Sequence, residues 1–353
     1  KELRRLKQAR GQAEPRQAAR REEADDLNGK DCVDWSSLTE WDDVKATDHG
    51  ATRVKGKMLL SSKHEELPES EREYKGRFVL QGCWQWDVSG KNVAKTVLGC
   101  DMVSAPIQVQ ELKILAAAGT RAGKARTVCA TADEKNGYIN ELLHGDAVWL
   151  DLSKGGHDLV PDHLRERVAS MRQPVVRVVK AMHGLRRSVF DYEAGRDTRF
   201  VDRNLTLVEG SRCIFSYTGS TGERCFLGVF IDDQIALGHE DAVREMYALL
   251  GRDVTRPDGS TSPRFPFKAP PLFGLKQHVL GLDLEIRLCG DRAEVSFSQA
   301  DYSHHWTGKF EEEFGLKLSP QVTPGVAPAA TSETKGRFAS VARSYVMAAM
   351  FSA

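Results

Sequence analysis

Apolar residues recur along the chain with two periods, and these periods predict helices and strands in mixed order. Helical spacing occurs in residues 108–119, which end at a glycine, and in residues 239–252. A run that begins at Val175 changes from a β-branched strand to a helix near Leu185. Short apolar runs typical of strands occupy residues 53–63, 72–82, 125–133, 211–217, 224–238, 279–288 and 293–299.

The order of these elements favours an α+β fold. Strands and helices do not alternate regularly, as they would in a parallel sheet, and the sequence has no internal repeat. We therefore expect an antiparallel sheet backed by helices. Ser298 and Asp301 predict the start of a further helix, which Gly315 ends. Gly and Pro residues gather in 256–271 and 319–332, and both stretches are predicted linkers.

One predicted strand pair has two acidic residues inside an apolar run. The stretch FLGVFIDDQIALG, residues 226–238, places Asp232 and Asp233 where two strands meet. Asp is a common turn residue, so a plain hairpin turn explains the pair. However, Asp-Asp suits the two central positions of a tight hairpin poorly, because these favour Asn-Gly or Asp-Gly. An unfavourable residue kept at a turn is typical of a functional site.

A third acidic residue, Asp133, makes metal binding at this turn possible. Asp133 ends the predicted strand 125–133. Carboxylates from two strands can hold two Mg²⁺ ions about 4 Å apart, which is what phosphoryl transfer by two metal ions requires. Asp133, Asp232 and Asp233 are therefore the candidate metal ligands and catalytic residues.

Composition allows a large core but gives no global sign of a partner. The chain has 353 residues, 41% of them hydrophobic, which is enough for two or three compact units and excludes a disordered protein. Lys plus Arg and Asp plus Glu both number 50, so a nucleic-acid-binding face would have to come from local segregation of charge. The seven cysteines lack zinc or redox spacing, which predicts reduced thiols in an intracellular protein.

The ends of the sequence and its longest apolar runs also limit the interpretation. Residues 1–30 carry both signs of charge and few large apolar side chains, so a frayed helix or a solvated tail is expected. No apolar run approaches the roughly 20 residues that cross a bilayer. The sequence starts at Lys1 and stops in mid-pattern, which predicts a piece of a longer protein.

The motifs together resemble the reverse transcriptase domain of copia-type retrotransposons. FIDD, residues 230–233, matches the aromatic-x-Asp-Asp hairpin of that class, and Asp133 matches its first catalytic aspartate. EYKGRFVLQG (73–82) is similar to the fingers motif of the family. VVKAMHGLRRSVFDY (178–192) is similar to its Lys-Ala-Leu-Tyr-Gly-Leu-Lys-Gln motif.

The resemblance extends over most of the chain. VLGLDLEI (279–286) resembles the strand that supports the primer in the family, which implies this role for Leu280 and Gly281. The motifs stand in the order of the family from about Arg53 to Pro324.

The resemblance also implies nucleotide-binding residues. Lys75 and Arg77 would lie near the incoming triphosphate, and Tyr138 would screen out a ribose 2′-OH. Arg187 stands where the family has a Gln that helps to hold the nucleotide. Each residue also has a plainer interpretation, namely a core aromatic residue for Tyr138 and solvated faces for the cations.

Departures from the family pattern leave two other interpretations open. Arg187 replaces the Gln, Gln81 replaces a Lys of the fingers, and Glu134 replaces a Val beside Asp133. The Glu134 carboxylate must point away or it will perturb the metal site. One alternative is a catalytically decayed, transposon-derived domain that only binds nucleic acid. The other is a structural or interaction protein whose acidic turn binds no metal.

The fold that the resemblance implies is a right-hand polymerase. Residues 1–50 would form a charged, partly disordered extension, 51–185 the fingers with the first palm strand, 186–287 the palm with its Asp-Asp hairpin, and 288–353 the start of a thumb.

The implied activity is RNA-directed DNA polymerisation within a retrotransposon polyprotein. Nucleotides (dNTPs) would be added to a primer 3′-OH with two Mg²⁺ ions, for which Mn²⁺ can substitute. The implied partners are an RNA or DNA template-primer duplex and dNTPs, with no membrane, in cytoplasmic particles or in the nucleus.

Overall fold

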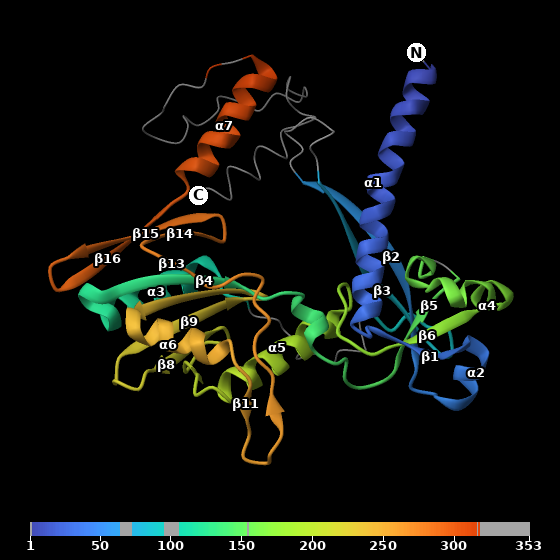
Figure 1. Ribbon diagram of the computed structural model, residues 1–353, viewed down its shortest axis with the longest axis horizontal. Helices are drawn as coiled ribbons and strands as arrows, with labels where there is room; N and C mark the ends of the chain where they lie inside the picture. The colour runs from blue at the N-terminus through green and yellow to red at the C-terminus, as the bar shows by residue number, and fades with distance from the viewer. Residues whose placement is uncertain (1, 64–72, 95–105, 154, 316, 318–353) are drawn as a thin grey trace, which may run out of the picture.

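The chain has an α+β fold, as the order of its predicted elements indicated. The structure, a computed structural model, describes residues 2–63, 73–94, 106–153, 155–315 and 317, with side chains from residue 15 onward except those of 301 and 302. The described strands form sheets of five, six, two and three strands. Figure 1 shows the five-stranded sheet at the right of the molecule and the six-stranded sheet at the left.

The five-stranded sheet has the order β1-β6-β5-β2-β3, and only the pair of β2 and β5 is parallel. The predicted pair of strands 53–63 and 72–82 is confirmed as β2 and β3. The elements of this part of the chain are α1 Glu2–Gly29, β1 Val33–Glu40, α2 Trp41–Thr47, β2 Thr52–Lys63, β3 Glu73–Asp87, β5 Val148–Asp151, α4 Arg165–Ser170 and β6 Pro174–Val178, with short 3-10 helices at His157–Leu159 and Asp162–Leu164.

The first fifty residues take part in the fold more closely than their charge suggested. Helix α1 lies along β3, where Ala24 and Leu27 enter the core. A Cβ atom at Gly76 would lie 2.5 Å from the Ala19 carbonyl oxygen, so this glycine allows helix and strand to approach closely. Strand β1 pairs with β6 at the edge of the sheet. The segment predicted as a charged extension therefore covers one strand and supplies another.

The six-stranded sheet has the order β13-β4-β10-β9-β8-β7 and is antiparallel throughout. Helix α3 packs on β9 and β10 from one face, and α6 packs on them from the other (Figure 1). The elements are α3 Val109–Gly123, β4 Thr127–Asp133, α5 Arg186–Val201, β7 Thr206–Leu207, β8 Ile214–Thr218, β9 Arg224–Phe230, β10 Asp233–His239, α6 Glu240–Leu250 and β13 Leu272–Gly274, with 3-10 helices at Lys124–Arg126 and Gly137–Asn140 (η3).

Gly119 lies inside α3 and does not end it, so the predicted helix stop was wrong. A Cβ atom at this position would lie 2.5 Å from the Cβ atom of Leu237 on β10. The glycine is needed for the close approach of helix and sheet. The helix continues to Gly123, where the same contact recurs against the backbone of Gly238.

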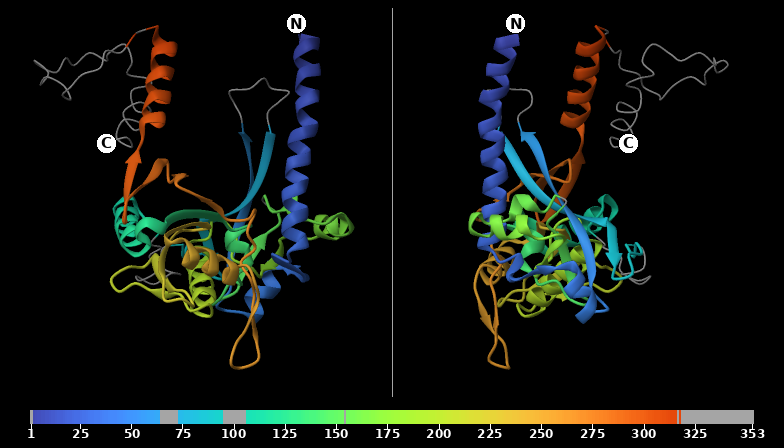
Figure 2. Two further views of the ribbon diagram at one scale, coloured as in Figure 1. Left: turned by 60° about the vertical axis from the view of Figure 1, so that its left-hand side comes forward. Right: turned by 90° about the vertical axis from the view of Figure 1, so that its right-hand side faces the viewer.

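The third sheet confirms the predicted hairpin in residues 279–299. Its strands are β14 Lys276–Val279, β15 Leu282–Cys289 and β16 Arg292–Ser298, followed by α7 Ala300–Phe314. Helix α7 ends at Gly315, where φ is 61°, as predicted, but its N-cap is Gln299 and not Ser298. Figure 2 shows α1, α7 and the β2–β3 pair extending to the same side of the molecule.

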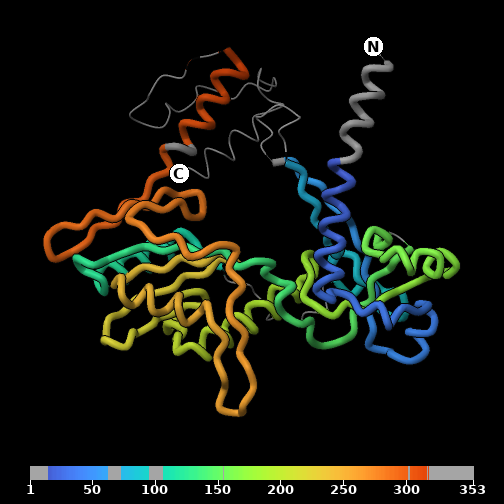
Figure 3. The backbone as a smooth tube through the Cα atoms, viewed as in Figure 1, coloured from blue at the N-terminus to red at the C-terminus, as the bar shows by residue number. Residues whose placement is uncertain are grey.

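The predicted linker 256–271 is instead part of the core and of the candidate site. It continues the β11–β12 hairpin (Val254–Thr255 and Thr261–Ser262) back to β13, a path that Figure 3 traces. Phe265 is 2% exposed and stacks on Phe200 with ring centroids 4.9 Å apart. Gly and Pro mark the turns of this segment, but its aromatic residues anchor it. The other predicted linker, 319–332, lies outside the described residues.

Arg203 joins the end of α5 to this returning segment from inside the protein. Its side chain is 1% exposed, so its donors need partners within the protein. They bond the carbonyl oxygens of Arg199, Leu249, Arg252, Ser262 and Pro263, and the Ser262 hydroxyl, at 2.8 to 3.1 Å. One guanidinium group thus joins the end of α5, the end of α6 and the returning segment.

Replacing Arg203 by Met should destabilise the fold strongly, because several buried carbonyl groups would lose their donor. Each such group costs about 1–3 kcal/mol, so we expect a loss of at least about 3 kcal/mol in the free energy of unfolding. Urea denaturation followed by circular dichroism measures it. The matched control is Arg264→Met at an exposed position, where the change should stay within about 0.5 kcal/mol. Equal losses in both variants would contradict this account of Arg203.

Candidate functional site

The fold brings the three predicted aspartates to one end of the six-stranded sheet. Strands β4 and β10 are neighbours, and their register pairs Asp133 directly with Asp233. Directly paired residues have Cα atoms about 5 Å apart and side chains on the same face. Asp232 lies in the turn that precedes β10. Two acids from the hairpin and one from the adjacent strand therefore lie at the same end of the sheet.

The turn of this hairpin is centred one residue earlier than the sequence suggested. Phe230 pairs with Asp233, so Ile231 and Asp232 are the two central residues. The φ angle of Ile231 is 58°, a value that β-branched residues rarely adopt because of clashes with the backbone. The unfavourable residue at the turn is Ile231, and not the Asp pair.

A lysine that sequence reasoning missed lies against the first aspartate. The Lys268 Nζ atom is 2.6 Å from Oδ1 of Asp133 and also contacts Oδ2, and the Lys268 backbone N–H donates to the Asp133 carbonyl oxygen at 2.9 Å. Lys268 lies in the segment interpreted as a linker, and no sequence pattern linked it to Asp133. Its ammonium group places a positive charge on the carboxylate that was expected to bind metal.

The environment of Asp233 disfavours its ionised form. Its pKa is raised above the ordinary value, first by desolvation and then by repulsion from Asp232 and Asp133, while Lys268 acts in the opposite direction. Such mutual repulsion is expected where carboxylates gather without enough positive charge. The Lys268 ammonium group offsets part of this repulsion.

The donor set fits a hard divalent cation. Mg²⁺ and Mn²⁺ prefer carboxylate oxygens, and one of the three carboxylates already holds a cationic group. Among the described residues, no three acidic, His or Cys side chains converge at metal-ligand spacing. Asp133 would have to release Lys268 before its oxygens could join those of Asp232 and Asp233.

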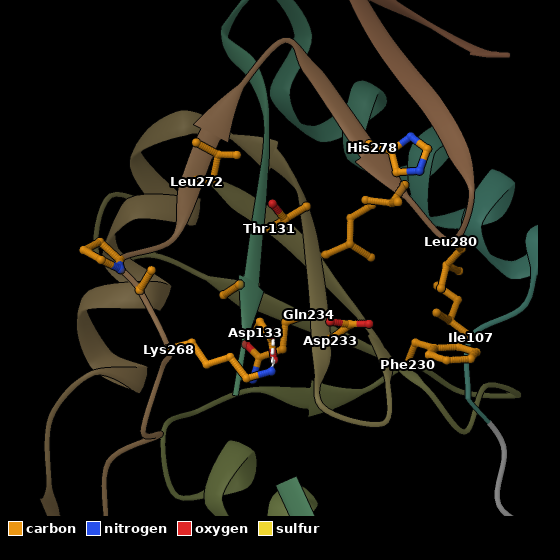
Figure 4. A pocket seen from close by; sticks show the side chains of 15 residues that line it. Ile107, Thr131, Asp133, Phe230, Asp233, Gln234, Lys268, Leu272, His278 and Leu280 are labelled. Atoms are coloured by element: carbon orange, nitrogen blue, oxygen red, sulfur yellow. Dashed lines mark hydrogen bonds and ion pairs between the residues drawn. The ribbon is translucent and has the colours of Figure 1, made fainter. Parts of the chain in front are cut away.

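One cavity lies between the six-stranded sheet and the β14–β15 hairpin (Figure 4). It has a volume of about 390 Å³, and its lining includes Asp133, Asp233 and Lys268 together with apolar side chains such as Phe230. Leu280 also lines it. The structure thus brings this residue, predicted to support a primer, to the same cavity as two of the aspartates.

Leu280 and Gly281 are the two central residues of the β14–β15 turn. Their φ angles are 51° and 74°, as a tight hairpin of the type I′ class requires. Gly281 is not among the residues that line the cavity. Gly281 allows the tight turn, and the turn places Leu280 at the cavity.

A second cavity of about 460 Å³ opens on the other side of the Asp-Asp turn. Asp232 lines it, and so do Lys75 and Arg77 from β3 and Tyr138 from η3. These are three of the four residues that the resemblance assigned to the nucleotide, and two of them are exposed cations. Within this cavity, Lys75, Arg77 and the Asp232 carboxylate offer groups that can bind a phosphate chain together with a divalent cation.

Two rings, those of Tyr138 and His183, line this second cavity. The Tyr138 ring meets His183 and Tyr192 edge-on, with ring centroids 5.0 and 5.5 Å apart. Desolvation, with Arg77 and Lys75 nearby, lowers the pKa of His183 to about 4. Desolvation and the Asp232 charge raise the pKa of Tyr138. Both side chains are therefore neutral near pH 7.

Helix α1 brings acidic residues to this cavity that the sequence did not indicate. Glu22, Glu23 and Asp26 line it together with the cations. Glu23 accepts a hydrogen bond from the Phe78 backbone N–H at 2.8 Å, and desolvation raises its pKa above the ordinary value. Glu23 thereby fastens α1 to β3.

Arg187 lies apart from the other predicted nucleotide-binding residues. Its Nε atom donates to Asp191 at 3.1 Å, one helical turn further along α5, and its guanidinium group packs on Gly145. It lines a small separate cavity with Gln85 and Asp146. In this conformation the Arg187 guanidinium group is paired with Asp191 on the same helix and does not enter the second cavity.

Glu134 points away from the aspartates, so its carboxylate does not join theirs. Its side chain is 0% exposed and accepts hydrogen bonds from Tyr192 at 2.6 Å, Asn140 at 3.0 Å and Arg199 at 3.1 Å. Successive residues of a strand face opposite sides of the sheet, so Asp133 and Glu134 diverge.

Comparison with protein-family models gives no match for this chain, and comparison with curated proteins gives none either. Among the described residues, no helix is both long and apolar enough to span a membrane.

Asp133→Asn should lower the pKa of Asp233. The substitution removes one repelling carboxylate and leaves the Lys268 ammonium without its present partner, and both changes favour ionised Asp233. Carbon-13 NMR titration of labelled aspartates in metal-free protein measures the shift. Asp258→Asn, in the distant and exposed β11–β12 hairpin, is the control and should leave the titration unchanged. An unchanged or raised pKa in Asp133→Asn would show that these carboxylates do not interact.

Proposed function

We propose that this chain is the RNA-directed DNA polymerase domain of a copia-type retrotransposon polyprotein. The observation that carries the proposal is the placement of Asp232 between a pair of acids on adjacent strands and a cavity lined by Lys75, Arg77 and Tyr138. The motif order of the sequence supports the same function. In this proposal the six-stranded sheet is the palm, the five-stranded sheet belongs to the fingers, and α7 starts a thumb.

The reaction is the addition of a dNTP to a primer 3′-OH, with release of pyrophosphate. Two divalent cations, when held by Asp133, Asp232 and Asp233, would lower the pKa of the attacking hydroxyl and neutralise the leaving group. Lys75 and Arg77 bind phosphate oxygens, with Arg offering a planar fork of donors. These contacts hold the nucleotide in position, which is the main contribution of the protein to phosphoryl transfer.

The remaining residues orient the substrates. In this proposal the Tyr138 ring contacts the sugar of a nucleotide whose phosphates reach Lys75 and Arg77, since all three residues line one cavity. Neutral His183 supports that ring from its edge without adding charge. Leu280, held by the β14–β15 turn, reaches the cavity that contains Asp133 and Asp233, and it would contact the primer terminus.

Primer extension on an RNA template with Mg²⁺ or Mn²⁺ tests the proposal. We expect extension by the wild-type chain and a loss on the order of 10³-fold or more in Asp232→Asn, because the carboxylate charge is needed to hold the cations. Asp258→Asn is the control and should extend like wild type.

Two other outcomes separate the alternatives. Duplex binding that weakens with salt, without extension, would indicate a decayed domain that only binds nucleic acid. Absence of both binding and Mg²⁺-dependent stabilisation would indicate a structural or interaction protein and would overturn the proposal.

Tyr138→Ala should relax discrimination against ribonucleotides, because it removes the ring proposed to exclude the 2′-OH. Steric exclusion of a hydroxyl is worth about 10–100-fold, so the ratio of kcat/KM for dNTP over rNTP should fall by about that factor. Single-nucleotide extension measures the ratio. Tyr138→Phe keeps the ring and is the matched control. An unchanged ratio in Tyr138→Ala would show that Tyr138 does not contact the sugar.

A further inference from the structure

The turn that carries Asp232 is fixed at two neighbouring carbonyl groups. The Ile231 carbonyl oxygen lies 3.4 Å from Arg196 Nη1 and 3.1 Å from Tyr192 Oη. The Asp232 carbonyl oxygen accepts a hydrogen bond from the Glu134 backbone N–H at 2.9 Å. These carbonyls belong to the peptide groups on either side of the Asp232 Cα atom. Holding both groups fixes the backbone from which the Asp232 carboxylate projects.

The groups that hold the turn are themselves buried and fixed. Tyr192 is 0% exposed and Arg196 is 2% exposed, so neither exchanges its partners for water. Tyr192 has a single hydroxyl hydrogen, and its shorter contact, 2.6 Å, is to Glu134 Oε2. The tyrosine therefore fixes the Glu134 side chain, while Arg196 donates to the Ile231 carbonyl oxygen. Arg196 is held in turn by Asp197 at 2.9 Å.

The turn needs such support because Ile231 is strained. Its φ of 58° is unfavourable for a β-branched residue, and such a conformation persists only where its surroundings enforce it. Without these contacts the turn would relax towards negative φ at Ile231, and Asp232 would leave its place beside Tyr138. The backbone strain and the contacts of the buried groups thus act on the same turn residues, Ile231 and Asp232.

We propose that Tyr192, Arg196 and Glu134 are positioning residues that hold the Ile231–Asp232 turn in its strained conformation and so aim the Asp232 carboxylate into the second cavity. None of the three lies among the aspartates expected to bind metal. The inference adds a buried support to the catalytic residues, and its kinetic consequence rests on the proposed polymerase function.

Two variants remove the support by different amounts. Tyr192→Phe deletes only the hydroxyl and keeps the ring against Tyr138. Arg196→Met deletes the donor to the Ile231 carbonyl oxygen. The matched control is Tyr247→Phe, since the Tyr247 hydroxyl is also buried but has no hydrogen-bond partner among the described residues.

The rescue variant is Ile231→Gly. Glycine adopts positive φ without steric cost, so a turn with glycine at this position needs no enforcement. If the network serves to hold the strained turn, adding Ile231→Gly to Arg196→Met should restore what the single substitution lost. A network that only stabilises the whole fold would not be rescued in this way.

Hydrogen exchange of the Glu134 amide in metal-free protein is the first measurement, because this N–H donates to the turn itself. We expect exchange at least about tenfold faster in Arg196→Met and Tyr192→Phe, wild-type exchange in Tyr247→Phe, and a return towards wild type in the Arg196→Met/Ile231→Gly double variant. The second measurement is primer extension, where kcat should fall about tenfold in Arg196→Met while KM for the dNTP changes less than about threefold.

The two measurements separate failure of this inference from failure of the proposed function. Exchange that is unchanged in both variants, or equally fast in the single and double variants, overturns the positioning role whatever the activity. A wild-type chain without polymerase activity overturns the proposed function, and the exchange measurement then decides the positioning role alone.

Discussion

The candidate site depends on the register between β4 and β10. This antiparallel pair places Asp133 opposite Asp233, and every pair from there to the other end of β10 follows from that match. A slip by one residue would turn Asp133 to the opposite face and would exchange the β4 side chains that now face α3 with those that face α6. The burial of β4 and β10 between α3 and α6 therefore specifies the position of the acids as firmly as it specifies the core.

Buried polar groups below this sheet hold the parts that the hydrophobic core cannot orient. Glu134, Tyr192, Arg196 and Arg199 lie beneath the Asp-Asp turn, and Arg203 ties α5 to the returning segment that carries Lys268. Burying charged groups is costly unless they are paired, and most donors of these groups have partners. Hydrogen bonds in such a network fix the orientation of the groups that they join, whereas apolar contacts fix mainly how closely the elements pack. The turn with Ile231 at positive φ is where that directional control is needed.

Local pattern reasoning was accurate where a segment is periodic and failed where contacts are long-range. The β2–β3 pair, the Asp-Asp hairpin and the β15–β16 hairpin follow from alternation and turn residues. Gly119 was interpreted as a helix end, but it is needed for packing against Leu237, a contact that spacing along the chain cannot indicate. The segment 256–271 was interpreted as a linker because Gly and Pro dominate it, although Phe265 and Lys268 anchor it.

The sequence by itself determined the α+β class and the hairpin with Asp232 and Asp233, because these follow from local periodicity. The end of a predicted strand nominated Asp133, and the resemblance to a family nominated Lys75, Arg77 and Tyr138. Only the tertiary structure decided which of them meet. It gathered Lys75, Arg77 and Tyr138 around Asp232, left Arg187 paired within its own helix, turned Glu134 inward and brought Lys268 to Asp133. The physical reason is that a side chain's partners are set by strand register and by the close approach of distant segments, which sequence spacing does not encode.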